Sequence, residues 1–358
     1  MSILLPFRPI PFLANRHLQT IMASQVNLCR EPPSTTVMVA LDDGDRIALE
    51  VSRPQGWRPD HPTVVMVHGL CGCHGSPYMI RMARKLWQRG VRAVRMNMRG
   101  CGSGRGVARQ PYHSGRSADV FAVLEHLYQS TPQSPTTLLG FSLGGNLVLK
   151  LAGELQAVAL RYVQQVIAVC PPADLAACVR LLALPSNRLY ERHFVQLLRD
   201  AVADRHRLYP DLPSVHLPSH LSLYTFDHVY TAPQCGFRDA DDYYARCSAA
   251  PLVPHITVPC RILLAADDPF IDASVFQQTA LPAHVQVTRT AQGGHLGFLG
   301  RPGMSGGFRW LDTLLLHWIN TAPGHAAAQP VTQPAEVEPR TTSQARSEGM
   351  QDSGSRHT

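Results

Sequence analysis

The stretch Leu139-Gly140-Phe141-Ser142-Leu143-Gly144-Gly145-Asn146 decides how the rest of the chain is interpreted. The apolar run 136–139 before it predicts a short buried strand, and the good helix formers after it predict a helix from Leu147 onward. The Gly-x-Ser-x-Gly pattern therefore lies at a strand-to-helix turn. Flanking glycines let strand and helix approach closely, and the turn presents the serine hydroxyl at the N-terminus of the helix. Ser142 is therefore a candidate nucleophile.

Alternating strand and helix patterns extend from this turn in both directions. A hairpin of strands 36–41 and 46–52 surrounds an Asp-Gly turn. The later expected strands are 63–68, 91–96, 136–140, 165–170, 261–265 and 284–288, and the expected helices are 77–89, 117–129, 147–154, 273–280 and 307–320. Apolar strands alternating with helices are typical of a parallel sheet covered on both faces. We therefore expect an α/β fold with a mostly parallel central sheet flanked by helices.

Changes in pattern divide the chain into three parts. Residues 1–33 are rich in proline and predict an irregular N-terminal arm with a short helical insert near 15–20. Residues 34–321 form the expected main domain. The segment at about 173–249 has helical periodicity without a strand pattern and predicts a helical cap inserted into that domain. Residues 322–358 have few large apolar side chains and predict a disordered tail.

Composition excludes several classes of protein. The 358 residues are 45% hydrophobic, which is enough to bury a sizeable core. No apolar run reaches the length of a membrane span, and prolines and arginines interrupt the first twenty residues, which argues against a signal peptide. We therefore expect a cytoplasmic protein. The nine cysteines are an odd number without regular spacing and predict no disulfide framework.

The net charge of +7 comes from scattered arginines. No basic stripe alternates with aromatic residues, so we expect no nucleic-acid partner. The excess of positive charge is compatible with weak contact with an anionic membrane surface. The oligomeric state does not follow from the sequence.

A dense group of His68, Cys71, Cys73 and His74 raises the question of a metal site. The C-x-C spacing is tighter than usual for zinc, and no second ligand pair follows at a suitable distance. We therefore expect neither a metal nor another cofactor, and we interpret this segment as part of a catalytic loop.

A serine nucleophile needs a base beside it and an acid that orients the base. Asp267 and Asp268 directly follow the expected strand 261–265, and His295 lies in a glycine-rich loop after the last strand. These positions provide the acid and the base in the order acid, then histidine. In Asp268-Pro-Phe-Ile271 an acid is followed three residues later by an aliphatic residue, and this pattern favours Asp268 as the acid that orients the histidine. Asp267 would then hydrogen-bond the turn. Asp267 stays open as the alternative.

Acyl chemistry also needs donors for the negative charge that develops on the carbonyl oxygen. The backbone N–H of Leu143, next to the serine, is one candidate. The second is the N–H of Leu70 in His68-Gly-Leu-Cys-Gly72, where glycines allow a close approach of the backbone. The alternative is that this loop only ends a strand.

Motifs spread over most of the chain resemble one family. They are His68-Gly-Leu-x-Gly72, Ser76-Pro-Tyr78, Asn97-x-Arg-Gly-Cys101, Tyr112-His-Ser-Gly115, Gly140-Phe-Ser-Leu-Gly-Gly-Asn146, Asp267-Asp-Pro-Phe270 and Gly293-Gly-His-x-Gly-Phe298. Further similar segments are Asn15-x-His-Leu-Gln-Thr20, Phe226-Asp227, Thr231-Ala-Pro233, Gly236-Phe237 and Asp242-Tyr-Tyr244. Together, from about Phe12 to Trp318, they resemble the YheT-type branch of the α/β-hydrolase fold, also called the AB hydrolase 4 family.

The resemblance implies a serine hydrolase with a helical cap, acting on carboxylic esters such as short- to medium-chain acyl esters or lipids. The family's catalytic residues carry over onto Ser142, Asp268 and His295. Some relatives transfer acyl groups to alcohols, so one alternative function is that of an alcohol O-acyltransferase. Another alternative is a non-catalytic binding module on the same fold. The resemblance assigns no role to Asn15, His17, Tyr112, His113 and Asp227, for which we expect structural roles.

Overall fold

The structure is a computed structural model that describes residues 6–25, 29–277, 279–302 and 307–321. The predicted disordered tail lies outside these residues. The strands are β1 (Thr35–Ala40), β2 (Arg46–Ser52), β3 (Thr63–Val67), β4 (Arg92–Met96), β5 (Thr136–Phe141), β6 (Gln165–Val169), β7 (Cys260–Ala265) and β8 (Val285–Thr290).

The strands of the described chain form one eight-stranded sheet in the order β1-β2-β4-β3-β5-β6-β7-β8. Strand β2 runs antiparallel to both of its neighbours, and all other neighbouring pairs are parallel. Every residue of β3, β4, β5 and β6 is buried, as expected for parallel strands with helices on both faces. The predicted mostly parallel sheet is confirmed.

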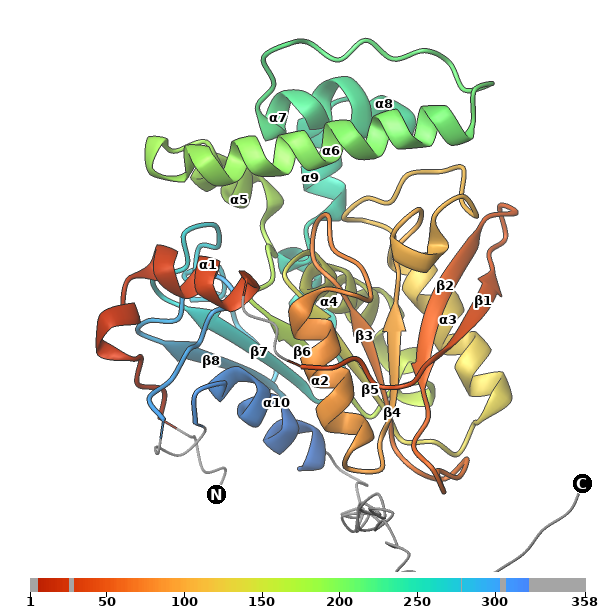
Figure 1. Cartoon of the computed structure of the whole chain (residues 1–358), viewed down its shortest axis with the longest axis vertical. Coiled ribbons are helices and arrows are strands. Elements are labelled where there is room, and N and C mark those ends of the chain that lie inside the picture. Colours follow the sequence, from red (N-terminus) through yellow and green to blue (C-terminus); the bar gives the residue numbers. More distant parts are fainter. Residues whose placement is uncertain (1–5, 26–28, 278, 303–306, 322–358) are drawn as a thin grey trace, which may run out of the picture.

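Helices cover the two faces of the sheet (Figure 1). The helices outside the cap are α1 (Arg16–Gln25), α2 (Pro77–Trp87), α3 (Ser117–Ser130), α4 (Leu143–Leu155) and α10 (Trp310–Asn320). Short turns of 3-10 helix are η1 (Pro11–Leu13), η2 (Gly102–Gly104), η3 (Gln156–Arg161), η4 (Pro185–Asn187) and η6 (Ala250–His255). None of the helices in the described residues is long and apolar enough to span a membrane.

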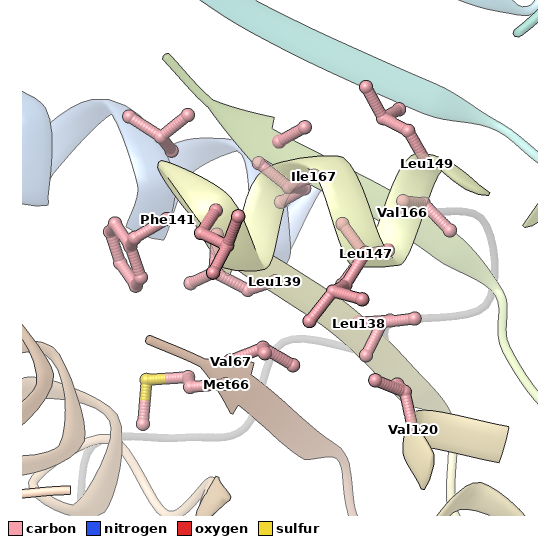
Figure 2. Close-up of a cluster of buried hydrophobic side chains, with 14 of the residues drawn as sticks. Met66, Val67, Val120, Leu138, Leu139, Phe141, Leu147, Leu149, Val166 and Ile167 are labelled. Atoms are coloured by element: carbon pink, nitrogen blue, oxygen red, sulfur yellow. The ribbon is translucent and has the colours of Figure 1, made fainter. Parts of the chain in front are cut away.

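The largest packed core surrounds β5 and α4. Figure 2 shows Leu138, Leu139 and Phe141 of β5 among buried side chains from β3, α3, α4 and β6. Leu147 of α4 is also fully enclosed in this cluster. Because protein interiors are close-packed, this cluster holds the turn between β5 and α4 rigidly in place.

A helical cap lies over the sheet as a separate layer (Figure 1). Its elements are α5 (Leu175–Leu182), α6 (Arg188–Leu208), α7 (Leu223–Phe226), the π-helical turn η5 (Asp227–Thr231), α8 (Ala232–Gln234) and α9 (Ala240–Cys247). The predicted helical insertion is thereby confirmed. The exposed ion pairs Arg105–Asp204 and Arg109–Asp211 join the end of α6 and the residues after it to the loop that follows β4.

The helix predicted at 273–280 is wrong. The described part of this segment forms turns in which Val275 N–H donates to Asp272 C=O and Gln277 N–H to Ser274 C=O. The Asp272 carboxylate also accepts from the Ser274 N–H and hydroxyl, and such local side-chain bonds compete with helix formation. The helix predicted from Leu147 begins four residues earlier, at Leu143.

Candidate active site

The turn between β5 and α4 places Ser142 directly before the first helical residue. Its φ of +51° lies in the left-handed region, which is strained for a residue with a side chain. Such strain persists where the surrounding structure enforces it, and here β5 and α4 are both buried in the core. The conformation presents the hydroxyl at the N-terminus of α4.

Close backbone contacts explain the two glycines of the motif. A Cβ on Gly140 would lie 2.2 Å from the carbonyl oxygen of Gly144, and a Cβ on Gly144 would lie 2.3 Å from that of Val67. Any larger residue would force β5, α4 and β3 apart. The glycines are therefore required by the packing of three elements and not by the turn alone.

His295 lies between Ser142 and an aspartate. Its Nε2 is 2.9 Å from Ser142 Oγ, and its Nδ1 is 2.8 Å from Asp268 Oδ2. The other oxygen of Asp268 accepts hydrogen bonds from the N–H groups of Phe270 and Ile271. The buried carboxylate is thus held from two sides, and the three side chains form one continuous hydrogen-bonded chain.

Asp267 has a different environment from its neighbour. Its carboxylate accepts from Gly294 N–H, in the loop that carries the histidine, and burial raises the pKa of Asp267. The same loop is held from the other side by α1, where Thr20 Oγ1 accepts from His295 N–H at 2.9 Å. Asp267 and Thr20 therefore fix the backbone of the loop, and Asp268 contacts the imidazole itself.

The loop after β3 packs directly on the serine. A Cβ on Gly69 would lie 3.1 Å from Ser142 Cβ. Gly69 N–H donates to the Tyr78 hydroxyl at 2.9 Å, and Cys71 N–H donates to the Tyr112 hydroxyl at 3.0 Å. Two tyrosine hydroxyls thus engage the N–H groups on either side of Leu70.

Leu70 N–H has no hydrogen-bond acceptor among the residues that the structure describes, and Leu70 lines the same cavity as Ser142. Leu143 is the first residue of α4, where a backbone N–H has no acceptor within the helix. Both predicted donors therefore belong to segments that border the serine hydroxyl.

A cavity of about 200 Å³ opens from the serine into the space beneath the cap. Apolar side chains of α5 and α6, among them Val179, Leu182 and Leu198, form much of its wall. Phe270 and Ile271 border it from the sheet side, next to His295. The three hydrogen-bonded side chains therefore face a mostly apolar chamber.

Comparison with known proteins now identifies the family. Residues 62–302 match the family model described as alpha/beta hydrolase fold. Over 327 residues the chain is 33% identical to YheT of Escherichia coli strain K12, a protein that carries the name of an esterase, and the match covers 88% of this chain and 93% of that protein. The chain belongs to the α/β-hydrolase family. The predicted resemblance to its YheT-type branch is confirmed.

More distant members of the α/β-hydrolase family show the same relationship. The human protein named phospholipase ABHD3 is 26% identical over 242 residues, which cover 66% of this chain and 59% of that protein. Among solved structures, 2,6-dihydroxy-pseudo-oxynicotine hydrolase has a TM-score of 0.55 at 18% identity, with 90% of this chain and 76% of that chain covered. This structural likeness supports the α/β-hydrolase fold.

The side chains of His68, Cys71, Cys73 and His74 do not bring their donor atoms close enough together to bind one metal ion. His68 is fully buried, where Nε2 accepts from Met98 N–H and Nδ1 lies 2.8 Å from Gly69 C=O. Burial lowers the pKa of His68 to about 4, so its ring is neutral and joins the loop to the segment after β4. His74 instead contacts Asn97 Oδ1, and burial raises the pKa of Cys71 to about 11.

Within the described residues, one group of three side chains has donor atoms close enough together for a metal ion, all within 4.8 Å of one another. It consists of Cys170, Asp268 and His295. Two of these donors already bond each other, and burial raises the pKa of the Cys170 thiol. A metal would have to displace that hydrogen bond and a tightly held proton, so the arrangement suits proton transfer better than metal binding.

The residues left without a role by the family likeness have contacts in the structure. Asn15 caps α1 by accepting from the N–H groups of His17 and Leu18, and His17 contacts Tyr190 of the cap. His113 packs edge-on against Tyr243. These contacts are structural.

Sequence reasoning missed the contribution of Thr20 and expected only a structural role for Tyr112. Tyr112 bonds the loop that carries Leu70, and Thr20 bonds the loop that carries His295. Both stand in motifs typical of the family, which was the only sequence signal for them. Their partners lie 41 and 275 positions away in the chain.

Proposed function

We propose that the protein is a serine esterase that cleaves carboxylic esters through Ser142, His295 and Asp268. The observation that carries the proposal is the hydrogen-bonded chain of these side chains, with distances of 2.9 and 2.8 Å, at the mouth of an apolar cavity. Family membership, an esterase name on the relative from Escherichia coli and a phospholipase name on the human relative agree with an ester substrate.

In the first step, Ser142 Oγ attacks the carbonyl carbon of the ester while its proton moves to His295 Nε2. The carboxylate of Asp268 keeps the imidazole oriented and stabilises its positive charge. The carbonyl oxygen becomes an oxyanion, to which Leu70 N–H and Leu143 N–H would donate. When the carbonyl double bond re-forms, the alcohol leaves with the proton from His295 Nε2, and the acyl group stays on Ser142.

In the second step, a water molecule loses a proton to His295 and attacks the acyl carbon. The carboxylic acid leaves, and Ser142 regains its proton. An alcohol that replaced this water would instead give a new ester by the same residues. The products of the reaction therefore distinguish an esterase from an acyltransferase.

The cavity indicates the class of acyl group. Its volume of about 200 Å³ is below the roughly 300 to 1,000 Å³ of pockets that enclose drug-sized ligands. Its walls between α5, α6 and Phe270 are mostly apolar. We therefore propose acyl groups of short to medium length, bound in the cavity with the ester carbonyl beside Ser142.

The test is turnover of p-nitrophenyl esters of increasing chain length by the parent protein and by Ser142→Ala. We expect loss of at least about a thousandfold in kcat for Ser142→Ala, because removal of the nucleophile leaves only binding and oxyanion contacts. The matched control is Ser130→Ala, whose hydroxyl lies exposed on α3 and bonds its own helix.

Three outcomes contradict parts of the proposal. Turnover retained in Ser142→Ala would exclude this serine as the nucleophile. Failure of the parent to react with a fluorophosphonate probe would indicate a binding module. If added ethanol were converted to ethyl esters in preference to hydrolysis, the protein would be an alcohol acyltransferase.

A further inference from the structure

Helix α1 carries its large apolar residues on the outside. Leu18, Ile21 and Met22 have exposed fractions of 43%, 45% and 38% and follow one another at the spacing of a single helix face. The inward face carries Gln19, which is fully buried. A helix that only covers a protein core shows the opposite pattern.

The orientation of α1 is fixed by Gln19. Its side-chain amide donates to the carbonyl oxygens of Leu13 and Leu299, and its side-chain oxygen accepts from Leu299 N–H at 2.7 Å. Rotation of the helix would bury the apolar stripe at the cost of these bonds in a buried site. The exposed stripe is therefore a consequence of the packing and does not reflect a loosely held helix.

A further exposed apolar residue and several arginines lie close to α1 along the chain. Phe12, in the turn before α1, is 89% exposed. The first thirty residues contain Arg8, Arg16 and Arg30 and no Asp or Glu, and Arg8 and Arg30 are exposed. We name the four apolar side chains Phe12, Leu18, Ile21 and Met22 the arm patch.

The beginning of α6 lies next to α1, as the contact between His17 and Tyr190 shows (Figure 1). It contributes Leu189, with an exposed fraction of 79%, and the exposed arginines Arg188 and Arg192. The neighbourhood of the arm patch thus combines large apolar side chains with arginine side chains from two elements.

We propose that the arm patch docks onto an anionic phospholipid surface. An amphipathic helix with apolar residues on one face and basic residues around it binds at the boundary between headgroups and acyl chains. The arginines would interact with lipid phosphates, and their aliphatic stems would lie along the apolar region.

A row of ring contacts links α1, which carries most of the arm patch, to His295. His17 of α1 stacks on Tyr190, Tyr190 packs edge-on against Phe270, and Phe270 contacts His295 with ring centroids 4.8 Å apart. Phe270 also lines the cavity. Docking at the patch would therefore bring the cavity close to the lipid from which an acyl ester could enter.

The test is co-sedimentation with vesicles of phosphatidylglycerol and phosphatidylcholine, compared with pure phosphatidylcholine. The protein carries Ser142→Ala, so binding is measured without turnover and does not depend on the proposed function. We expect preferential binding to the anionic vesicles. The variant Leu18→Ser, Ile21→Ser, Met22→Ser should lower the partition coefficient by about tenfold or more, because it removes three apolar side chains from the lipid contact.

The matched control replaces Val158 and Leu160, two exposed apolar residues of η3, by serine and should bind like the parent. Turnover of a water-soluble ester, measured with the serine restored, should be unchanged in the arm variant and shows that it is folded. If that variant does not fold, Phe12→Ser and the pair Arg8→Glu, Arg30→Glu serve instead and should weaken binding to anionic vesicles.

Three results would overturn the proposal. The first is that the parent does not bind anionic vesicles, and the second is that the parent and the arm variant bind them equally. The third is a parent that is dimeric without lipid and an arm variant that is monomeric, because the patch would then be an interface between two copies of the chain.

Discussion

The hydroxyl of Tyr112 has one backbone partner, Cys71 N–H, directly after Leu70. Tyr78 holds Gly69 N–H on the other side in the same way. Two tyrosine side chains outside the proposed triad thus hold the loop that carries Leu70. Because the N–H groups of Gly69 and Cys71 are already paired, Leu70 N–H is the donor of this loop that we propose for a substrate oxygen.

We predict that Tyr112→Phe lowers kcat by about tenfold, with a smaller change in KM. The substitution leaves Cys71 N–H without its acceptor, an unpaired donor costs about 1 to 3 kcal/mol, and the loop relieves this cost by shifting away from its catalytic position. Steady-state kinetics on a soluble ester measure the effect. Tyr128→Phe, on α3, is the control, and an unchanged kcat in Tyr112→Phe would show that the loop keeps its position without this hydrogen bond.

A buried carboxylate joins two elements of the cap. Asp227, in the π-helical turn η5, accepts hydrogen bonds from the hydroxyls of Thr231 and of Tyr244 in α9. No cation faces these oxygens in the described structure, and burial raises the pKa of Asp227 to about 6. The folded protein therefore keeps a proton on Asp227 at pH values where the unfolded chain has lost it.

This difference predicts how stability depends on pH. Because the folded pKa of about 6 lies above the ordinary 3.8, Asp227 makes the free energy of unfolding decrease as pH rises from about 4 to about 6. Asp227→Asn resembles the protonated form and lacks this dependence. We expect both proteins to be equally stable at pH 4 and the variant to be more stable at pH 7 by on the order of 2 kcal/mol.

Urea denaturation at the two pH values measures this difference. Asp60→Asn, whose carboxylate is exposed beside Arg58, controls for the loss of one negative charge. A stability difference between Asp227→Asn and the parent that is the same at both pH values would contradict the prediction.

One buried ion cluster joins two helices that lie far apart in the chain. Asp312 of α10 is buried and bonds Arg81 and Lys85 of α2, which lie more than 220 positions earlier in the chain. Figure 1 shows α2 and α10 side by side on one face of the sheet. The contact therefore ties the last helix of the described chain to a helix near its start.

We predict that Asp312→Ala lowers the free energy of unfolding by about 3 to 5 kcal/mol, because it leaves the buried Arg81 guanidinium without a counter-ion. Asp60→Ala removes an exposed ion pair that solvent screens, and it should lower the stability far less. Chemical denaturation of both variants measures the two values. Similar values for the two would mean that the buried cluster contributes no more than a surface pair.

Local sequence patterns carried much of the fold and the candidate site. Alternating apolar strands and helices predicted the parallel sheet, and the Gly-x-Ser-x-Gly turn pointed to Ser142. Strand-ending positions pointed to His295 and to the pair Asp267 and Asp268. Each of these patterns is contained within a few consecutive residues, so the geometry of its turn or strand follows from local physical chemistry. The segment 273–280 had helix formers as well, but its local side-chain bonds produced turns instead.

The α/β architecture, the serine turn and the candidate acid and base therefore followed from the amino-acid sequence, because periodicity and turn chemistry are local properties. Only the tertiary structure placed Asp268 against the imidazole and Asp267 against Gly294 N–H, since adjacent side chains of one turn point in different directions. It also brought Thr20 and Tyr112 to their loops and left the apolar side of α1 outward. Those outcomes depend on contacts between residues far apart in the chain, whose burial and hydrogen bonding no local pattern specifies.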